Sequence, residues 1–344
     1  MRQSPSQRSS TKHLLLMVAL VSAAMPASMR AQKADLASAD KVVTRSASAL
    51  LALEDGRVEE ATTLARASLA GNPGDAYSHQ LLCRAFYAQD RADEAVQECE
   101  AAVALPQNQQ SASDNQLWLG RAYGLKARHA GPINGFKLAR RVQASFARAV
   151  DLDSSNVAAM NDLGEYYVEA PSIVGGGTDK AKALAARMMP RFPAQAHLLL
   201  ARIAVDDKDN GTAEAEFKQV IAIQKNTQSW VDLAAFYQTH HRQDDAVAAV
   251  KAGLALDRTH GPAVVDAASI LIAMHREPDL AERCLELYLT SKAKTDEAPA
   301  FKVHVELSRL LVARGLSTEA GQHTDAATAL APVFTRNSRQ WQGL

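Results

Sequence analysis

The segment AYSHQLLCRAFYAQDRADEAVQECEAAVALP, residues 76–106, contains the pattern that decides the fold. Its first half places apolar residues on one helical face, and a polar turn follows at residues 89–91. The second half repeats small residues at helical spacing, at Ala95, Cys99 and Ala102. Small residues at a helix crossing let two antiparallel helices approach closely, while larger ones fill the groove between them. Pro106 ends the second helix, so the segment predicts one helical hairpin.

A small residue returns at the position of Ala95 along most of the chain. These eight ruler positions are Ala61, Ala95, Val142, Ala181, Ala213, Ala246, Ala281 and Ala320, with successive gaps of 34, 47, 39, 32, 33, 35 and 39 residues. A period in the thirties is typical of stacked helical hairpins, each of which must bury two sides against its neighbours. We therefore expect an all-α, right-handed superhelical solenoid of about eight hairpins over residues 40–335. Its concave face would be lined by the first helix of each hairpin.

The first helices carry a second recurring pattern. Leu-Gly-x-x-Tyr occurs at residues 119–123 and again at 163–167, where Ala181 and Pro193 follow in the second helix. This combination resembles the tetratricopeptide repeat (TPR) family. The resemblance implies TPR-like hairpins and a non-catalytic scaffold that binds a partner peptide or protein in the concave groove.

The two ends of the chain differ from the repeats. Residues 1–31 have a basic start, an apolar run of twelve residues and small residues at the end, which is the layout of a secretory signal peptide. The alternative is an uncleaved anchor. Residues 336–344 are expected to form a C-terminal tail, and no membrane span is expected after residue 31. We therefore expect a periplasmic or secreted protein.

Charge limits the classes of partner. The chain has 38 basic and 38 acidic residues, and removal of residues 1–31 takes away four basic residues and no acid, which leaves a net charge of −4. Nucleic-acid binding needs a strong basic excess, so no nucleic-acid partner is expected. The expected partner is an exported or envelope protein that the sequence does not identify, and the alternative is a small apolar ligand.

Two adjacent units exceed the period. About ten residues are added between Gly120 and Val142, and about five between Gly164 and Ala181, compared with the other units. We expect both insertions, near 126–137 and 170–178, to form loops in the turns of their hairpins and to emerge side by side at one edge. The loop residues singled out are Gly131, Pro132, Pro171, Gly175, Gly176 and Gly177.

The triple glycine of the second insertion allows two interpretations. Its N–H groups could bind an anion at the start of the following helix. Alternatively the glycines form a tight turn, with Thr178 or Asp179 as the helix N-cap. A basic cluster flanks the first insertion, and a solvated helix face is the alternative explanation for it.

A narrower resemblance centres on this loop. The residues that carry it are Tyr166, Tyr167, Ala170, Pro171, Gly175–Gly177, Lys180 and Ala181. They are similar to exported bacterial repeat proteins, including the periplasmic T-component associated with TRAP-type solute transporters. The resemblance implies an all-helical periplasmic protein that binds a solute-binding partner or a small apolar ligand, which gives the alternative function of a transporter-associated accessory protein.

Counting from the Leu-Gly pair identifies side chains that face the groove. The predicted partner-binding residues are Tyr77, Gln80, Arg84, Tyr87, Trp118, Arg121, Asn161 and Glu165, and the same count places Asp162, Arg202, Asp206, Asp232 and Gln238 on the groove face. Aromatic residues and arginines dominate the energetics of peptide binding. Arg84 and Arg121 occupy equivalent positions and could hold a carboxylate of the partner together. Alternatively they pair with local acids, and the aromatic side chains pack between repeats.

Cysteine and histidine usage suggests structure rather than chemistry. Cys83 and Cys99 lie at the crossing of one hairpin, where a disulfide would contribute roughly 3 kcal/mol; two packed thiols are the alternative. Cys284 has no expected partner. No zinc-binding spacing, nucleophile elbow or dinucleotide glycine pattern occurs, so no metal, no cofactor and no catalytic residue is expected. An enzyme is the third and least supported class.

Overall fold

The computed structural model describes residues 44–337 as a chain of α-helices joined by short turns. A first helix covers residues 44–54. It is followed by α3 (Val58–Gly71), α4 (Ala76–Ala88), α5 (Ala92–Ala104), α6 (Gln109–Arg128), α7 (Pro132–Leu152), α8 (Val157–Glu169), the 3-10 helix η1 (Ser172–Val174) and α9 (Thr178–Met188). The second half contains α10 (Pro193–Asp206), α11 (Asn210–Gln224), α12 (Thr227–Thr239), α13 (Gln243–Leu256), α14 (Pro262–Ala273), α15 (Pro278–Thr290), α16 (Ala300–Ala313), α17 (Ser317–Leu330) and α18 (Pro332–Asn337).

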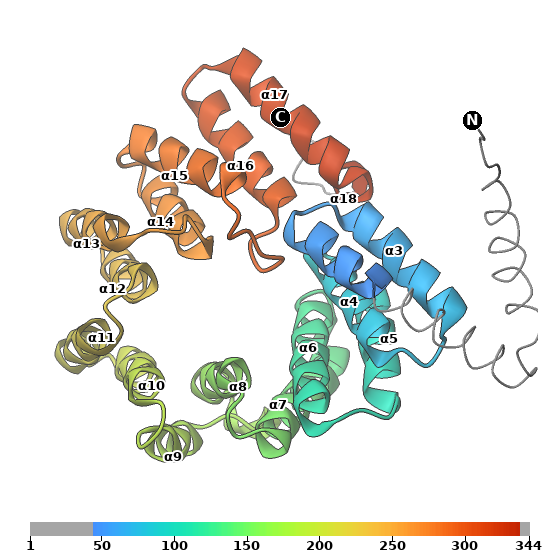
Figure 1. Cartoon of the computed structure of the whole chain (residues 1–344). Coiled ribbons are helices and arrows are strands. Elements are labelled where there is room, and N and C mark those ends of the chain that lie inside the picture. The colour runs from blue at the N-terminus through green and yellow to red at the C-terminus, as the bar shows by residue number, and fades with distance from the viewer. Residues whose placement is uncertain (1–43, 338–344) are drawn as a thin grey trace, which may run out of the picture.

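These helices form the predicted solenoid of antiparallel hairpins. The helix over 44–54 pairs with α3, and each even-numbered helix from α4 to α16 pairs with the helix that follows it, which gives the eight hairpins expected from the period. Between α8 and α15, the first helix of each hairpin lies on the inner side of the curve and the second lies outside (Figure 1). The predicted signal peptide lies outside the described residues, as does the predicted tail beyond Asn337.

The ruler positions explain why the hairpins pack closely. In seven of the eight hairpins, the ruler alanine is the fourth residue of the second helix. All eight ruler side chains are buried, with Val142 the most exposed at 6%. A methyl group at this point lets the second helix approach the first without a cavity. The period therefore reflects one steric requirement, met once in each hairpin.

Five of the eight hairpins share a left-handed residue in the turn between their two helices. It lies five positions before the ruler residue and has a φ between 59° and 79° at Gly56, Asp90, Lys208, His241 and Gly315. A left-handed residue after a helix lets the chain reverse while the last carbonyl groups still accept hydrogen bonds. The backbone geometry therefore sets the turn, and a glycine occupies the left-handed position in only two of these five turns.

The first insertion does not form the loop predicted near 126–137. It lengthens both helices of its hairpin instead: α6 has 20 residues and α7 has 21, compared with 13 each for α4 and α5. Only residues 129–131 form the turn, and Pro132 begins α7 at a position where its missing N–H costs nothing. Val142 consequently lies about two turns deeper in its helix than the other ruler residues. The predicted length of the insertion was correct, but the inserted residues on both sides of Gly131 form helix and not a loop.

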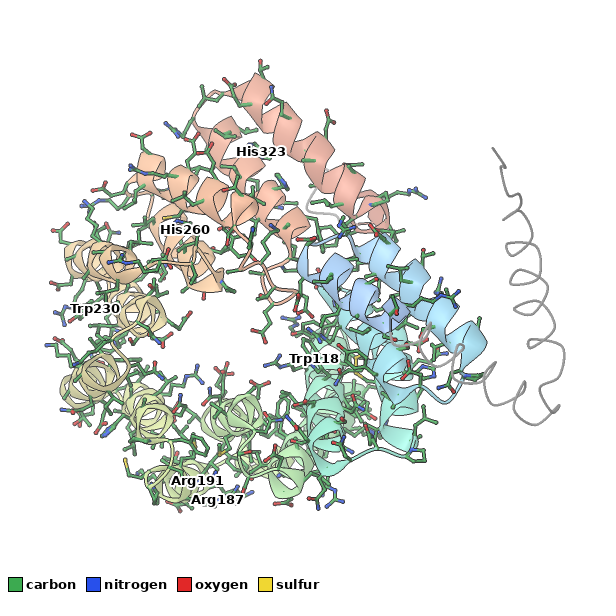
Figure 2. The ribbon with its side chains drawn as sticks, viewed as in Figure 1. Trp118, Arg187, Arg191, Trp230, His260 and His323 are labelled. Atoms are coloured by element: carbon green, nitrogen blue, oxygen red, sulfur yellow. A yellow bond between two sulfur atoms is a disulfide. The ribbon has the colours of Figure 1, made fainter. Side chains whose placement is uncertain are left out.

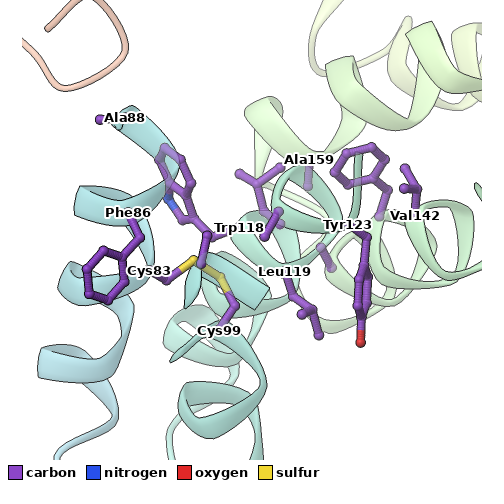
Figure 3. Close-up of a cluster of buried hydrophobic side chains, with 14 of the residues drawn as sticks. Cys83, Phe86, Ala88, Cys99, Trp118, Leu119, Tyr123, Val142 and Ala159 are labelled. Atoms are coloured by element: carbon purple, nitrogen blue, oxygen red, sulfur yellow. A yellow bond between two sulfur atoms is a disulfide. The ribbon is translucent and has the colours of Figure 1, made fainter. Parts of the chain in front are cut away.

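A disulfide joins the two helices of the second hairpin. Cys83 on α4 and Cys99 on α5 are bonded, with their Cα atoms 5.2 Å apart. Both are buried in the cluster that contains Phe86 and Trp118 (Figure 3). The bond fixes α4 against α5 next to the inner face. Cys284 is a free, buried thiol, and burial raises its pKa to about 11.

The last hairpin returns to the first, so the solenoid closes on itself. The Phe301 and Phe334 rings lie 4.9 Å apart, and both belong to one buried cluster with Leu53 of the first helix. Gly56 approaches α16 so closely that a Cβ there would lie 2.9 Å from the Cβ of Ala300. Figure 1 shows α16 and α18 beside α3. This closure joins segments from opposite ends of the described chain.

Candidate binding site on the concave face

Two neighbouring hollows lie along the inner helices. The first, of about 580 Å³, lies between α4, α6, α7 and α8, and Tyr87, Trp118 and Arg121 are among its lining residues. The second, of about 460 Å³, lies between α8, α10, α11 and α12. Glu165 and Glu169 line both hollows, so together the hollows form one groove along the inner helices α6, α8, α10 and α12.

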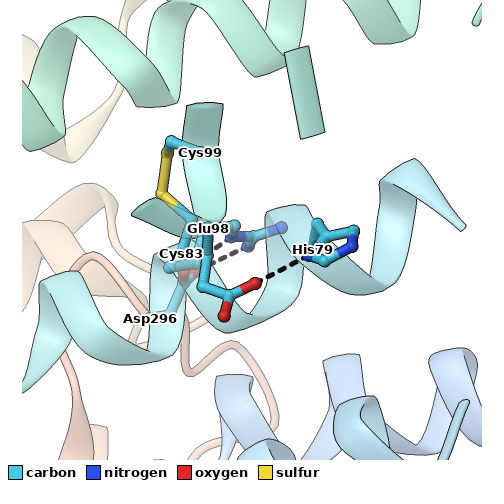
Figure 4. The surroundings of a disulfide bond; sticks show 6 residues. His79, Cys83, Glu98, Cys99 and Asp296 are labelled. Atoms are coloured by element: carbon cyan, nitrogen blue, oxygen red, sulfur yellow. Dashed lines mark hydrogen bonds and ion pairs between the residues drawn. A yellow bond between two sulfur atoms is a disulfide. The ribbon is translucent and has the colours of Figure 1, made fainter. Parts of the chain in front are cut away.

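Arg84 binds a carboxylate of the chain itself. Its Nε and Nη2 donate to Oδ2 and Oδ1 of Asp296 at 2.8 and 2.7 Å (Figure 4). Asp296 lies 212 residues further along the chain, and its side chain is only 4% exposed. Planar two-point contacts of this kind are the strongest arginine–carboxylate geometry.

Arg121 also binds carboxylates of the same chain. Its Nε donates to Oδ2 of Asp162 at 2.7 Å, and its Nη1 donates to Oε1 of Glu297 at 2.9 Å. Burial alone would lower the pKa of Arg121, but the hydrogen bond to Asp162 and the two carboxylate charges raise it above the ordinary value. Arg121 is therefore a fixed cation whose donors are directed to groups of the same chain.

Trp118 lies between these two arginines. The Arg84 and Arg121 guanidinium carbons lie 5.2 and 4.8 Å from its ring centroid, and the Tyr87 ring meets it edge-on at 5.6 Å. Figure 2 shows Trp118 at the inner side of the closed curve, whereas Arg187 and Arg191 lie at the outer side. The indole is only 8% exposed, so it packs between repeats as well as facing the first hollow.

The loop that supplies Asp296 and Glu297 is itself held in place. It covers residues 291–299, between α15 and α16. The Tyr288 hydroxyl donates to the carbonyl of Ala298 at 2.6 Å and accepts from the N–H of Thr295 at 3.0 Å. We call residues 291–299 the strap. Its contacts with Arg84 and Arg121 place it against α4 and α6, where it adds to the closure of the solenoid.

Some of the other predicted groove residues line a hollow and some do not. Glu165 is exposed in the groove and accepts from Nη1 of Arg202 at 3.0 Å. Tyr77 is 41% exposed, Asn161 is half-buried and Gln80 is buried, and none of these three lines either hollow. The groove thus gathers Tyr87, Trp118, Arg121 and Glu165.

The second hollow contains residues that the sequence reasoning missed. Its apolar floor includes Phe217 from α11, and the count along first helices could not find a residue of a second helix. Glu169 was missed because it ends α8, one turn beyond Glu165. Asp296 and Glu297 were missed because their loop has no place in the repeat pattern.

The triple glycine forms the tight turn, and its N–H groups are used internally. Those of Gly175, Gly176 and Gly177 donate to the carbonyls of Ser172, Pro171 and Tyr167 at 3.0, 3.2 and 2.8 Å. The Lys180 ammonium donates to the Gly175 carbonyl at 2.8 Å. No side chain caps α9, so neither Thr178 nor Asp179 has the expected capping role. The geometry gives no support to the anion interpretation.

The second insertion lies against α7, the long helix that the first insertion extends. The Tyr166 hydroxyl lies 2.8 Å from the carbonyl oxygen of Ala139 on α7 and 2.9 Å from that of Val174 in η1. Gly131, Pro132 and Pro171 are exposed at this edge. Ile133 and Ile173 are also exposed, at 77% and 73%. Large apolar side chains are therefore presented to solvent on both insertions.

Among residues 44–337, no three His, Cys, Asp or Glu side chains gather closely enough to form a metal site. A pair of histidines does occur, where the Nδ1 atoms of His304 and His323 lie 2.9 Å apart between α16 and α17. Over the same residues, no helix is long and apolar enough to cross a bilayer.

Comparison with known proteins found similar solved structures but no match to a protein family or to a curated protein. No model of a protein family matches the chain, and no curated protein matches it in sequence. A thermophilic TPR protein of Thermus thermophilus has 18% identity over 56% of this chain and 92% of its own, with a TM-score of 0.42. A tetratricopeptide repeat protein of Parabacteroides merdae has 13% identity over 83% of this chain and 99% of its own, with a TM-score of 0.45. The protein pilF of Pseudomonas aeruginosa has 14% identity over 68% of this chain and 97% of its own, with a TM-score of 0.36. The fold of TPR-like hairpins rests on the hairpin geometry described above, and these scores carry no conclusion about function.

Proposed function

We propose that the protein is a non-catalytic scaffold of the bacterial cell envelope that binds a segment of another exported protein along its concave face. The observation that carries this proposal is the groove formed by the two hollows, which crosses α6, α8, α10 and α12. A groove across several repeats suits an extended polypeptide, because each repeat can contact a successive part of it.

Two further observations support the envelope location. Residues 1–31 have the layout of a signal peptide, and Cys83 is bonded to Cys99. Disulfides persist in oxidising compartments such as the periplasm and are rare in the cytosol. The protein would thus be exported before the disulfide forms.

Photo-crosslinking in the native envelope tests the binding face. A benzoylphenylalanine in place of Val168, which lines the second hollow, should give adducts with a protein partner. The same group in place of Gln219, exposed on the outer helix α11, is the matched control and should give none. Adducts of equal yield from both positions, or from Gln219 alone, would show that the concave face is not the binding face.

A further inference from the structure

The second hollow combines an apolar floor with an acidic rim. Phe217 and Phe236 are buried beneath it with their ring centroids 5.4 Å apart, and the half-buried Leu198 and Val205 lie beside them. Apolar surface of this kind gains free energy when a partner covers it. Exposed or half-buried carboxylates surround the floor, namely Glu165, Glu169, Asp206 and Asp232.

Within the described residues, the negative charge of this rim is only partly balanced by basic side chains. Among the described residues that line the second hollow, Arg202 is the sole basic side chain, and its ion pair is with Glu165. Asp232 accepts a hydrogen bond from the neutral side chain of Gln228 at 3.0 Å. Burial raises the pKa of Asp232, and burial followed by the charge of Glu165 raises that of Glu169, while the charge of Arg202 offsets both shifts only in part. A cation brought into the hollow would relieve both effects.

The first hollow of the same groove differs from the second in how its acids are paired with basic side chains. There, Arg121 forms ion pairs with Asp162 and Glu297, and Arg84 forms one with Asp296 nearby. Beyond the second hollow, the next two first helices present further acids, Asp266 and Glu306. Burial raises the pKa of both, and Glu306 accepts from the neutral hydroxyl of Ser269 at 2.6 Å, while the charge of Arg309 offsets part of the shift of Glu306. The acidic character therefore continues along the stack from α8 to α16.

We infer that the second hollow binds a lysine- or arginine-bearing segment of the partner protein. The aliphatic stem of such a side chain covers the floor over Phe236 and Val205, and its charged end reaches Glu169, Asp206 and Asp232. Long basic side chains bind in this manner because their stems are apolar and their ends are charged. The inference rests on the proposed function and names the chemistry of the partner.

Binding of three short peptides tests it. The probes are fluorescein-labelled ten-residue peptides that alternate leucine with lysine, with glutamine or with glutamate, measured by fluorescence anisotropy at about 0.1 M salt, where charges within about 10 Å still interact. The groove variant is Glu169→Gln with Asp206→Asn. The matched control, Glu319→Gln with Asp325→Asn, removes the same charge from exposed positions on the outer helix α17.

The lysine peptide should bind at least tenfold more tightly than the glutamine peptide. The groove variant should weaken its binding about tenfold, and the control variant should change it less than twofold. Equal affinities for the lysine and glutamine peptides, no binding of the lysine peptide, or equal losses in the two variants would overturn the inference. If the glutamate peptide binds best and crosslinks through position 168, the cationic partner is wrong and the scaffold function stands. If position 168 gives no adduct with any partner or peptide, the proposed function fails as well.

Discussion

The contact between Arg84 and Asp296 gives the sharpest test of how the solenoid closes. Arg84→Ala would leave a carboxylate that is 4% exposed without its cation and without both hydrogen bonds. Removing one partner of a buried ion pair costs about 3–5 kcal/mol. The contact of the guanidinium with the Trp118 ring, at 5.2 Å, contributes about 1 kcal/mol more. We expect Arg84→Ala to lower the free energy of unfolding by about 5 kcal/mol.

Asp296→Ala and the double variant complete the cycle. Arg84 keeps an exposed fraction of 16%, so its charge is less deeply buried than that of Asp296, and Asp296→Ala should cost less than Arg84→Ala. The double variant should cost clearly less than the sum, because no unpaired charge then remains buried. Arg140→Ala, at an exposed position on α7, is the matched control and should change stability by less than about 0.5 kcal/mol.

Urea unfolding measures the free energies, and hydrogen exchange shows where the effect falls. Repeat arrays can unfold in steps, so the exchange rates of the strap (residues 291–299) should be followed alongside the global transition. In Arg84→Ala, exchange in the strap should rise first. A loss of stability no larger than that of Arg140→Ala, or additive losses in the double variant, would refute the view that this pair holds the strap against α4.

Three further outcomes follow from the structure. Burial and then the charge of His323 lower the pKa of His304 to about 4, so between pH 6.5 and 4 the unfolded chain binds a proton that the folded chain does not. The contribution of neutral His304 to the free energy of unfolding should be complete above pH 6.5 and should fall by on the order of 2 kcal/mol towards pH 4 in urea titrations. His304→Gln should flatten this pH dependence. An unchanged slope in that variant would contradict the role given to His304. Gly176→Ala should destabilise the fold by about 2–3 kcal/mol in the same assay, since its Cβ would lie 1.7 Å from the carbonyl oxygen of Ala170, whereas Gly131→Ala, with nothing within 4 Å, should be nearly neutral; equal effects would speak against this packing. Reduction of the disulfide between α4 and α5 should lower the free energy of unfolding by roughly 3 kcal/mol, and a melting curve that does not respond to reductant would show that the bond is not formed in solution.

The hairpins and their order could be predicted from the sequence because each depends on local requirements. The ruler alanines report a helix crossing that recurs in every repeat, and that crossing needs a small side chain whatever the rest of the chain does. The same frame placed Cys83 opposite Cys99, where the structure has the disulfide. The repeat frame could not predict whether the residues around Gly131 form helix or a loop, because an insertion of this length is compatible with both.

The candidate site depends on distances that no local pattern contains. The sequence alone placed Arg84 and Arg121 on the inner face, but their carboxylate partners, Asp296 and Glu297, lie in a loop between the last two hairpins. Whether that loop meets α4 depends on the sum of small rotations between eight stacked hairpins, and an error in each rotation accumulates along the solenoid. The repeat therefore determined the fold and the inward positions. The tertiary structure alone decided that the solenoid closes, that it uses these arginines in closing, and that a single basic side chain, Arg202, lines the second hollow beside four acids.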